Sequence, residues 1–395
     1  MLTAKENKLI NLLIITSILI FIQIGPVSIS FPIGVFFLYK LRRRVKFAIW
    51  NSHIRWLSLL FVVGVFSTIF SPLPIQGRNF YFLLQLVYWL LLATFVGQLY
   101  LYIDKNSFSK SIVLGCLILG AVNLLGGLGT QNSVAFILVV IAPIGICAFK
   151  TNIAKLFYAF LIFVMMLFNE SRSGLAILSI ELLVIISRML STRNAKLILW
   201  SVLIFVGIFI GNSQFRKIVG NIIAPYNSEM SLLLIDPESI LSNDKSWIQR
   251  QVQVQKGIQI FQEYPLIGIG ANNFTPMTVD INYNAISNRV DKNALVSVSK
   301  SADNRSTHNS YITLLSEYGI LGTICWFVFI FTFMKRVYKK LRNLDEFDFI
   351  LFITSLGLSV YFYTIAALYG TAVWIVYGLY YGCARKYQVK CKLEK

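Results

Sequence analysis

Long apolar segments follow one another along most of this 395-residue chain, with short connections between them. A helix that crosses a lipid bilayer needs about 20 mostly apolar residues, and several segments approach this length. Twelve candidate spans lie at residues 9–25, 27–39, 56–72, 80–103, 108–126, 133–149, 153–169, 174–190, 196–211, 319–334, 348–366 and 368–384, of which the second is short and the last two are poorly separated. Only 13% of the residues are charged, whereas a soluble domain usually has about 25%. The sequence therefore predicts an all-α, polytopic membrane bundle of about twelve transmembrane helices.

The lysine and arginine residues gather in alternate connections. If the amino terminus is cytoplasmic, the inner connections and the two termini hold 24 of the 36 Lys and Arg residues. The short outer connections hold only Arg78 and Arg172. This distribution follows the positive-inside rule and predicts a multi-pass protein of the cytoplasmic membrane. Because topology accounts for the net charge of +19, the charge does not indicate a nucleic-acid partner.

The same rule divides the chain into four parts. We expect transmembrane helices 1–9 in residues 1–211, one large extracytoplasmic loop in 212–309, transmembrane helices 10–12 in 310–384, and a cytoplasmic tail in 385–395. The large loop is nearly balanced in charge, unlike the inner connections. A loop of this length is usually functional or mobile.

One segment of the large loop, from Ser246 to Tyr264, has helical spacing. Its apolar residues form a single stripe, which consists of Trp247, Val254, Ile258 and Phe261. Pro265 ends the predicted helix. Arg250 lies near the edge of the stripe, and Lys256 follows a turn and a half later. Taken alone, these two cations are typical of the solvated face of an amphipathic helix.

Arg172 stands in a short outer connection, against the general distribution of charge. An arginine at this depth can simply extend its side chain to the lipid headgroups. It is also suited to bind an anion, because a guanidinium stays charged and can bond two oxygens at once. Ser173 and Gly174 open the next helix, so backbone N–H groups and the positive end of that helix would face the same anion.

His308 lies where the polar loop re-enters an apolar segment. An ionisable imidazole at a membrane surface is unusual and suggests a function, although a lone histidine before a helix is as often a capping or packing residue. Asn309 follows it and Arg305 precedes it. The spacing predicts a helix over residues 310–318 that Gly319 stops. Glu181, inside the eighth span, is a further candidate by burial, and we expect it to pair with a polar neighbour in the bundle.

Several classes of chemistry lack the necessary residues. The chain has two histidines and no cluster with metal-ligand spacing, so a metal site built on imidazole is not expected. No glycine-rich nucleotide loop is present, so no cofactor is predicted. None of the five cysteines lies in the large loop, which leaves that loop without a disulfide framework.

Three motifs together resemble the O-antigen ligase and Wzy-type polysaccharide polymerase superfamily. Ser171-Arg172-Ser173-Gly174 is similar to the outer SRSG loop of that superfamily. Arg250, followed by Phe261 and by Pro265-Leu266-Ile267-Gly268-Ile269-Gly270, resembles its R…F…P-L-x-G-x-G stretch. His308-Asn309 with Gly319 and Gly322-Thr323 resembles its histidine motif. The resemblance covers about residues 169–326; the first 150 residues match only in hydropathy, and the end of the chain adds little.

The resemblance implies a helical bundle of the GT-C-like type in the bacterial inner membrane, with its active site facing the periplasm or exterior. It implies an inverting glycosyltransferase whose donor is a glycan on a polyprenyl diphosphate. The residues fit that chemistry. Arg172 and Arg250, with Arg305 as a weaker third and Ser173 beside them, would hold the diphosphate. His308 would accept the proton of the acceptor hydroxyl, and Asn309 would orient the acceptor or the imidazole. The arginines would take the electrostatic role that a metal has elsewhere.

The motifs leave the acceptor open. A ligase transfers the finished glycan to a lipid A core, and a polymerase transfers a growing glycan to another lipid-linked repeat unit. The complete histidine motif slightly favours a ligase. Outer arginines also suit a transporter of a small anion such as bicarbonate, but the sequence shows no inverted repeat. A purely structural membrane protein would leave the outer cations without a role.

Overall fold

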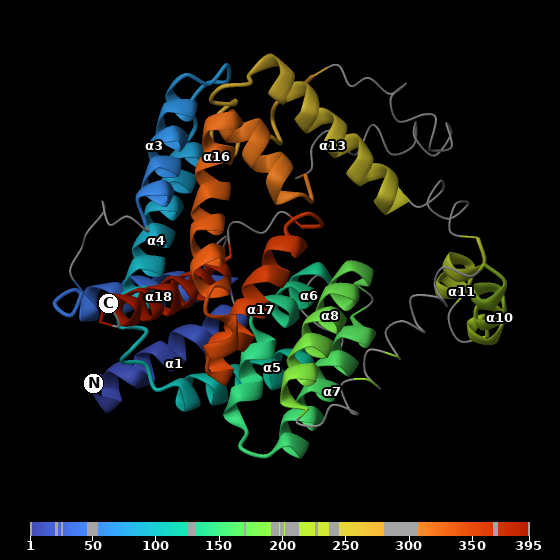
Figure 1. Ribbon diagram of the computed structural model, residues 1–395. Helices are drawn as coiled ribbons and strands as arrows, with labels where there is room; N and C mark the ends of the chain where they lie inside the picture. Colours follow the sequence, from blue (N-terminus) through green and yellow to red (C-terminus); the bar gives the residue numbers. More distant parts are fainter. Residues whose placement is uncertain are drawn as a thin grey trace.

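The structure, a computed structural model, is built almost entirely of helices (Figure 1). It describes residues 2–19, 23–24, 27–45, 54–124, 131–169, 171–190, 197, 201, 213–225, 228–236, 245–279, 307–365 and 370–393. Its elements are α1 (Ala4–Ile18), β1 (Gln23–Ile24), β2 (Val27–Ser28), α2 (Ser30–Leu41), α3 (Arg55–Ile69), α4 (Gly77–Leu99), α5 (Lys105–Leu124), α6 (Gln131–Val140), the 3₁₀ helix η1 (Ala142–Ala148), α7 (Asn152–Phe168), α8 (Arg172–Met189), α10 (Ser213–Ile223), α11 (Ser228–Ile235), α13 (Lys245–Glu263), α16 (Ser310–Tyr338), the 3₁₀ helix η2 (Leu341–Asn343), α17 (Glu346–Tyr361) and α18 (Thr371–Leu393). The two short strands pair antiparallel.

Most of the predicted spans coincide with helices, but the count of twelve is not confirmed. Among the described residues, three helices are long and apolar enough to cross a membrane: α4, residues 105–123 of α5, and α16. Helices α2, α3 and α7 are apolar but shorter. Most of the predicted span 196–211 lies outside the described residues.

The predicted span at 133–149 is not one helix. It divides into α6 and η1, and the backbone of Ile141 between them is not helical. Pro143 is the second residue of η1. A proline lacks the amide that a continuous α-helix needs, and its ring clashes with the carbonyl one turn earlier, so the α-helix cannot run through this point.

Three tryptophans from different helices join the centre of the bundle. Trp89 of α4 stacks on Trp374 of α18, with ring centroids 5.8 Å apart. Trp326 of α16 meets Trp374 edge-on at 6.0 Å. All three side chains are buried. Below them α4 and α18 approach closely. A Cβ on Gly378 would stand only 2.9 Å from the carbonyl oxygen of Ala93, so the absence of a side chain allows the two backbones to pack together.

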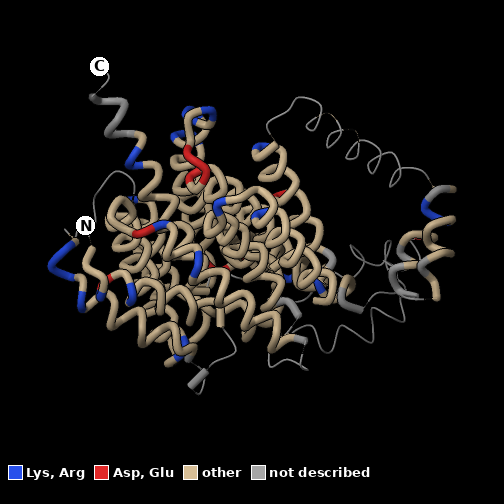
Figure 2. The backbone as a smooth tube through the Cα atoms, turned by 90° about the horizontal axis from the view of Figure 1, so that it is seen from below, with Lys and Arg blue, Asp and Glu red and all other residues tan. Residues whose placement is uncertain are grey.

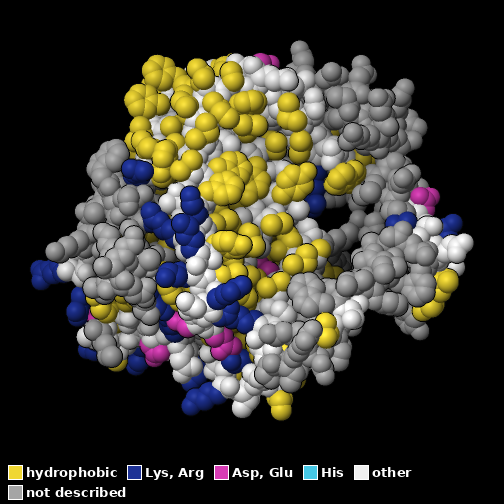
Figure 3. Space-filling view, viewed as in Figure 1, with side chains coloured by type: hydrophobic (Ala, Val, Ile, Leu, Met, Phe, Trp, Pro, Cys, Tyr) yellow, Lys and Arg dark blue, Asp and Glu magenta, His cyan; other side chains and the backbone are white. Residues whose placement is uncertain are grey.

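Apolar side chains cover the outside of the bundle over α3 and α16 (Figure 3). Phe66, Phe70, Phe80, Leu84 and Phe331 are each more than half exposed. A continuous apolar surface of this kind is unstable in water and suits lipid chains. The surface therefore agrees with the apolar composition of the chain. Helices α10 and α11 lie apart from this bundle (Figure 1).

Helix α16 contains a sharp kink at Gly319. This residue has φ 61° and ψ −164°, which is not helical, and it separates residues 310–318 from residues 320–338. The predicted helix over 310–318 with its stop at Gly319 is therefore confirmed. Across the kink the ring of Tyr311 stacks on that of Phe327, with centroids 5.4 Å apart. The first section of α16 thus turns back toward the second.

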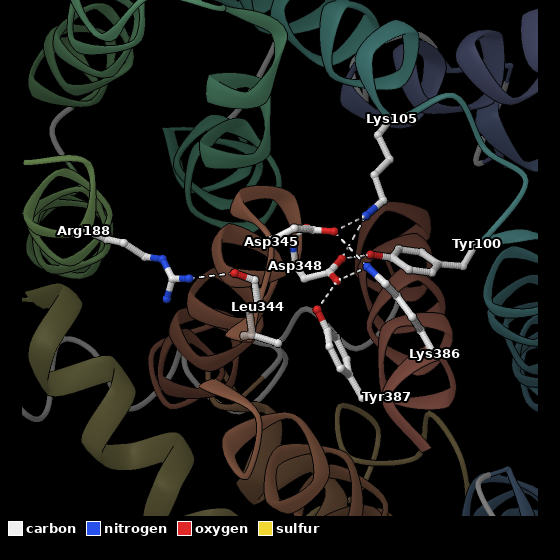
Figure 4. A network of polar contacts seen from close by, with 8 residues as sticks. All are labelled: Tyr100, Lys105, Arg188, Leu344, Asp345, Asp348, Lys386 and Tyr387. Carbon is white, nitrogen blue, oxygen red and sulfur yellow. Dashed lines mark hydrogen bonds and ion pairs between the residues drawn. The ribbon is translucent and has the colours of Figure 1, made fainter. Parts of the chain in front are cut away.

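Helix α17 begins in a network of charged groups (Figure 4). Asp348 is buried and accepts bonds from Lys105 at 3.0 Å, Lys386 at 2.7 Å and Tyr387 at 2.8 Å, as well as from Tyr100. These partners come from α5, α18 and the end of α4. The network therefore fixes the first turn of α17 to three other parts of the bundle.

Two further basic residues hold the same end of the bundle. Lys155 of α7 pairs with Glu346, with N–O distances of 2.5 and 2.6 Å. Arg188 at the end of α8 donates to the backbone carbonyls of Leu341 and Leu344 at 3.1 and 2.7 Å. Lys and Arg residues predominate over acidic residues when the bundle is viewed from below (Figure 2). Residues that the sequence marked as topology signals thus also bind the helices together.

Candidate functional site

The turn after α13 docks onto the kink of α16. Four backbone hydrogen bonds of 2.9–3.2 Å join residues 265–270 to residues 316–321. A break in a helix leaves amides and carbonyls without their usual intrahelical partners. Here the turn supplies those partners, since the amides of Ile320 and Leu321 donate to the carbonyls of Pro265 and Leu266. The second and third sequence motifs are therefore one structural unit.

Two motif glycines make this close docking possible. Gly268 and Gly319 have φ angles of 72° and 61°, a region that residues with a side chain rarely adopt. A Cβ on Gly268 would overlap the backbone of Glu317, and one on Gly319 would overlap the backbone of Leu266. The two glycines are thus explained by packing.

Glu317 supports the turn from below. Its buried carboxylate accepts the amides of Asn272 at 3.0 Å and Phe274 at 3.1 Å. Asn273 between them donates to Ser71 and accepts from Asn79, both at 2.9 Å. The loop between α3 and α4 thereby holds the same turn. No sequence motif indicated this structural role of Glu317.

His308 occupies a strained position directly before α16. Its φ angle is 48°, which is uncommon for a residue with a side chain. The side chain is half-buried. Asn309 follows as the N-cap, and its Oδ1 accepts the amides of Tyr311 and Ile312 at 3.0 and 3.1 Å. The structure thus gives Asn309 a capping role, and a role in substrate binding stays a prediction.

The start of α16 rests on the carboxyl end of α17. The amide of Ser310 donates to the carbonyls of Phe362 at 2.8 Å and Ile365 at 3.1 Å. The Ser310 hydroxyl donates to Ile365 at 2.6 Å, and the Tyr311 hydroxyl donates to the carbonyl of Ser359. These bonds fix the turn that carries His308 against residues 359–365.

The last residue of α17, Tyr361, lies close to the other two motifs. Its hydroxyl is near the side chain of Ser171 and within electrostatic range of the guanidinium of Arg250. Ser171 is the N-cap of α8. The carboxyl end of α17 therefore brings together Ser171, Arg250 and the turn of His308, which are far apart in sequence.

The remaining predicted site residues are described less completely. Arg172 is the first residue of α8, and its side chain lies outside the described part of the chain. Ser173 follows in the first turn of α8 and is half-buried. Arg305 lies outside the described residues. The structure therefore locates the helix end that carries Arg172 and Ser173.

Helix α13 packs against the bundle through a face that lies beside the apolar stripe seen in the sequence. Trp247 is exposed, and Val254, Ile258 and Phe261 are only partly buried. The fully buried apolar residues are Ile248, Val252 and Ile260. The reason is the contact with α16, where Gly257 lies against Ile312. Tertiary packing has thus selected the neighbouring face, which also carries polar groups.

Two buried polar side chains lie on that face. Lys256 donates to the carbonyl of Thr275 at 3.4 Å and stands 5.1 Å from the ring centroid of Phe274, so it supports the turn. Gln253 is fully buried, and neither atom of its amide is hydrogen-bonded in the described part of the chain. Helices α13 and the first section of α16 run side by side in one direction (Figure 1). Gly257 lies against Ile312. Gln253 lies one helical turn before Gly257, and His308 lies four residues before Ile312. Gln253 is therefore near the level of His308.

Glu181 does not have the polar partner that the sequence suggested. Its side chain is buried on α8, and neither carboxylate oxygen is hydrogen-bonded among the described residues. It lies against Gly357 of α17, where a Cβ would overlap the carboxyl group. The expectation of a pair in the bundle is wrong for this part of the chain, because the small residue opposite Glu181 offers space and no bonding group.

The arrangement is chemically suited to an anionic substrate. Arg250 supplies a permanent positive charge, and the amino-terminal end of α8 adds backbone amides and the positive end of a helix dipole. The half-buried imidazole of His308 stands on the turn bonded to the same end of α17. A cationic helix end and a titratable base near one another suit transfer of a group whose leaving group is an anion.

A comparison with known protein families gave a match. Residues 157–327 match the family model described as O-Antigen ligase. This segment runs from α7 through the kink of α16 and contains all three motifs. No curated protein matches the chain. With its apolar helices, the match indicates an integral protein of the bacterial inner membrane with glycosyltransferase-like activity. Residues 157–327, less than half of the chain, are thus similar to the O-antigen ligase/Wzy superfamily of membrane enzymes.

Proposed function

We propose that this protein is an inverting glycosyltransferase of the outer face of the inner membrane. It transfers a glycan from a polyprenyl diphosphate carrier to a hydroxyl acceptor without a metal ion. The observation that carries the proposal is the meeting of Ser171, Arg250 and the His308 turn at the carboxyl end of α17.

The leaving group determines the role of the cations. As the bond between the anomeric carbon and the phosphate oxygen breaks, negative charge develops on the lipid-linked diphosphate. Guanidinium groups stabilise that charge and bond two phosphate oxygens at once. Arg250 takes this role, with Arg172 at the start of α8 and Arg305 as a further candidate. The amides at the start of α8, including that of Ser173, support the same anion.

The acceptor hydroxyl needs a base, because an alcohol is a poor nucleophile at neutral pH. Neutral His308 removes its proton while the hydroxyl oxygen attacks the anomeric carbon from the face opposite the diphosphate. The new glycosidic bond forms with inversion, and the proton remains on the imidazole until it returns to solvent. General base catalysis of this kind contributes roughly 10²–10⁴-fold to the rate. Asn309 holds the histidine turn in place through its cap.

The experiment uses purified protein in liposomes with a polyprenyl-diphosphate-linked glycan. His308→Asn should bind the donor without consuming it. Arg250→Lys should lose most of the transfer, because an ammonium cannot reproduce a bidentate contact. Turnover retained by His308→Asn would remove the base assignment. A rate that depends on an added divalent ion would contradict the metal-free scheme.

Two versions of the proposal differ in the acceptor that receives the glycan, and the ligase version is slightly favoured. A lipid A core supplied as the only acceptor should receive the glycan from a ligase. A second lipid-linked repeat unit should be extended instead by a polymerase. Uptake of labelled bicarbonate into the same liposomes, without glycan transfer, would support an anion transporter and overturn both versions.

A further inference from the structure

Arg78 is one of the two arginines that the sequence places in short outer connections, and the proposed function leaves it without a role. It lies in the first turn of α4, directly after the loop that joins α3 to α4. That loop lies beside the turn after α13 (Figure 1), to which the Ser71 hydroxyl is bonded. A cation in the first turn of a helix faces the positive end of the helix dipole, which is unfavourable unless an anion is also present. The position of Arg78 therefore favours a negative partner.

No acidic side chain in the described part of the chain forms an ion pair with Arg78. Its Nη2 atom donates to the neutral Oδ1 of Asn273 at 3.5 Å. Its Nε atom is buried and has no hydrogen bond among the described residues. Glu317, the acidic residue that supports the same turn, already accepts two backbone amides. The guanidinium thus keeps capacity to bind an anion.

Buried polar residues form a rigid frame beside the guanidinium of Arg78. Asn273 is 1% exposed, and its amide nitrogen donates to the Ser71 hydroxyl and to the carbonyl of Ile269, both at 2.9 Å. The fully buried Asn79 donates to the Oδ1 atom of Asn273, also at 2.9 Å. The Oδ1 atom that Arg78 contacts is therefore held in place from several sides. This setting differs from that of an arginine extended from an open helix surface.

Helix α4 exposes large apolar side chains in the turns that follow Arg78. Phe80 and Leu84 are 61% and 66% exposed. On the adjacent helix α3, Phe66 and Phe70 are also exposed, and their rings stack with centroids 6.3 Å apart. A cation at the edge of an exposed apolar face matches a phospholipid, which has an anionic phosphate and apolar chains. A soluble anion would use the cation and leave the apolar face uncovered.

We propose that Arg78 binds the phosphate of a phospholipid in the outer leaflet, whose chains lie along α3 and α4. The guanidinium donates to two phosphate oxygens, and the positive end of α4 favours the same anion. Because Arg78 also contacts Asn273, the bound lipid holds the start of α4 against the turn after α13. The site uses none of the arginines assigned to the diphosphate, so the inference does not depend on glycan transfer.

The test uses the full-length protein, purified in detergent and stripped of lipid. A ligand that binds only the folded state raises the melting temperature as its concentration increases. Short-chain phosphatidylglycerol should stabilise the protein, whereas inorganic phosphate and a phosphate-free glycolipid with the same chains should do so only weakly. Arg78→Gln should need about tenfold more phosphatidylglycerol for the same gain, because it lacks the charged hydrogen bonds to phosphate. Lys217→Gln, which removes an exposed cation of α10, is the matched control and should respond like the unmodified protein.

A charge reversal separates lipid binding from support of the fold. Without lipid, Arg78→Glu should melt no lower than the unmodified protein, because a carboxylate suits the amino-terminal end of a helix. With phosphatidylglycerol it should gain no stability, because it repels the phosphate.

Three results would overturn the inference. The first is an equal gain from phosphatidylglycerol in Arg78→Gln and the unmodified protein. The second is stabilisation by inorganic phosphate as strong as that by phosphatidylglycerol, which would indicate a site for free anions. The third is an Arg78→Glu variant that melts lower without lipid and still responds fully to phosphatidylglycerol, which would show that the arginine serves the fold alone.

Discussion

Asp348 and Tyr361 stand at opposite ends of α17, about 20 Å apart along the helix axis. Asp348 is bonded to two lysines and two tyrosines, and Tyr361 lies near Ser171 and Arg250. One helix therefore joins an ion network to the point where the three motifs meet. The ion network fixes the first turn of α17 in the bundle, and the position of the helix then determines where its carboxyl end lies among the three motifs.

Asp348→Asn should destabilise the protein strongly. The side chain is fully buried, and its loss of charge leaves Lys105 and Lys386 without their inner partner. Breaking a buried ion pair from one side costs about 3–5 kcal/mol. Asp345→Asn is the matched control, because the side chain is 47% exposed and an exposed pair contributes about 0–1 kcal/mol. Chemical denaturation in detergent measures both, and equal effects would contradict a dominant role for Asp348.

Asp345 should also make stability depend on pH in the acid range. Burial alone would raise the pKa of this carboxyl, but the hydrogen bonds from Lys386 and the Asp348 amide, together with the charges of Lys105 and Lys386, lower it to about 2. A depressed pKa in the folded state favours folding above the ordinary value near 4. This contribution should disappear as the pH falls from about 4 to about 2. Thermal melts across that window should show a flatter pH dependence for Asp345→Asn, and identical curves would refute the assignment.

Gly319→Ala should disrupt the docking of the α13 turn. Alanine disfavours the φ of 61°, and its Cβ would overlap the backbone of Leu266. We expect a loss of about 2–3 kcal/mol from strain together with weakened docking bonds. Gly77→Ala at the start of α4 is the control, because no atom lies within 4 Å of its Cβ position. If the two variants have the same melting temperature, the kink does not depend on glycine.

The sequence predicted helices well because their local signals are strong. Proline and glycine mark the ends of α13 and of the first section of α16, and these ends agree with the structure. The sequence did not show which face of α13 is buried, since that face is chosen by contact with α16. From the sequence alone, Tyr361 is one more aromatic residue in an apolar span. Only the packing of α17 against Ser171 reveals its contact, so the end of the chain contributes more than the motifs suggested.

Gln253→Met should show whether the Gln253 amide serves glycan transfer or the stability of the fold. The Gln253 amide is fully buried, and neither of its polar atoms is bonded in the described structure. Replacing such a group with an apolar side chain of similar shape should leave stability unchanged or raise it by up to about 1–2 kcal/mol. A catalytic or binding role is one of the explanations for a buried polar group without a partner, and on that explanation we expect slower glycan transfer. Gln262→Met, on an exposed position of α13, should change neither property. Unchanged turnover in Gln253→Met would leave the amide without a functional role.

The backbone of His308 determines which substitution tests its side chain cleanly. At φ 48°, glycine and asparagine are tolerated, whereas alanine costs about 1 kcal/mol. His308→Gly and His308→Asn should therefore keep the melting temperature of the unmodified protein, and His308→Ala should melt a few degrees lower. All three should lose transfer, because none carries a base. If His308→Asn transfers glycan at an undiminished rate, the imidazole has no part in the reaction. If His308→Gly is unfolded, the histidine side chain stabilises the turn, and the loss of activity in that variant has a structural cause.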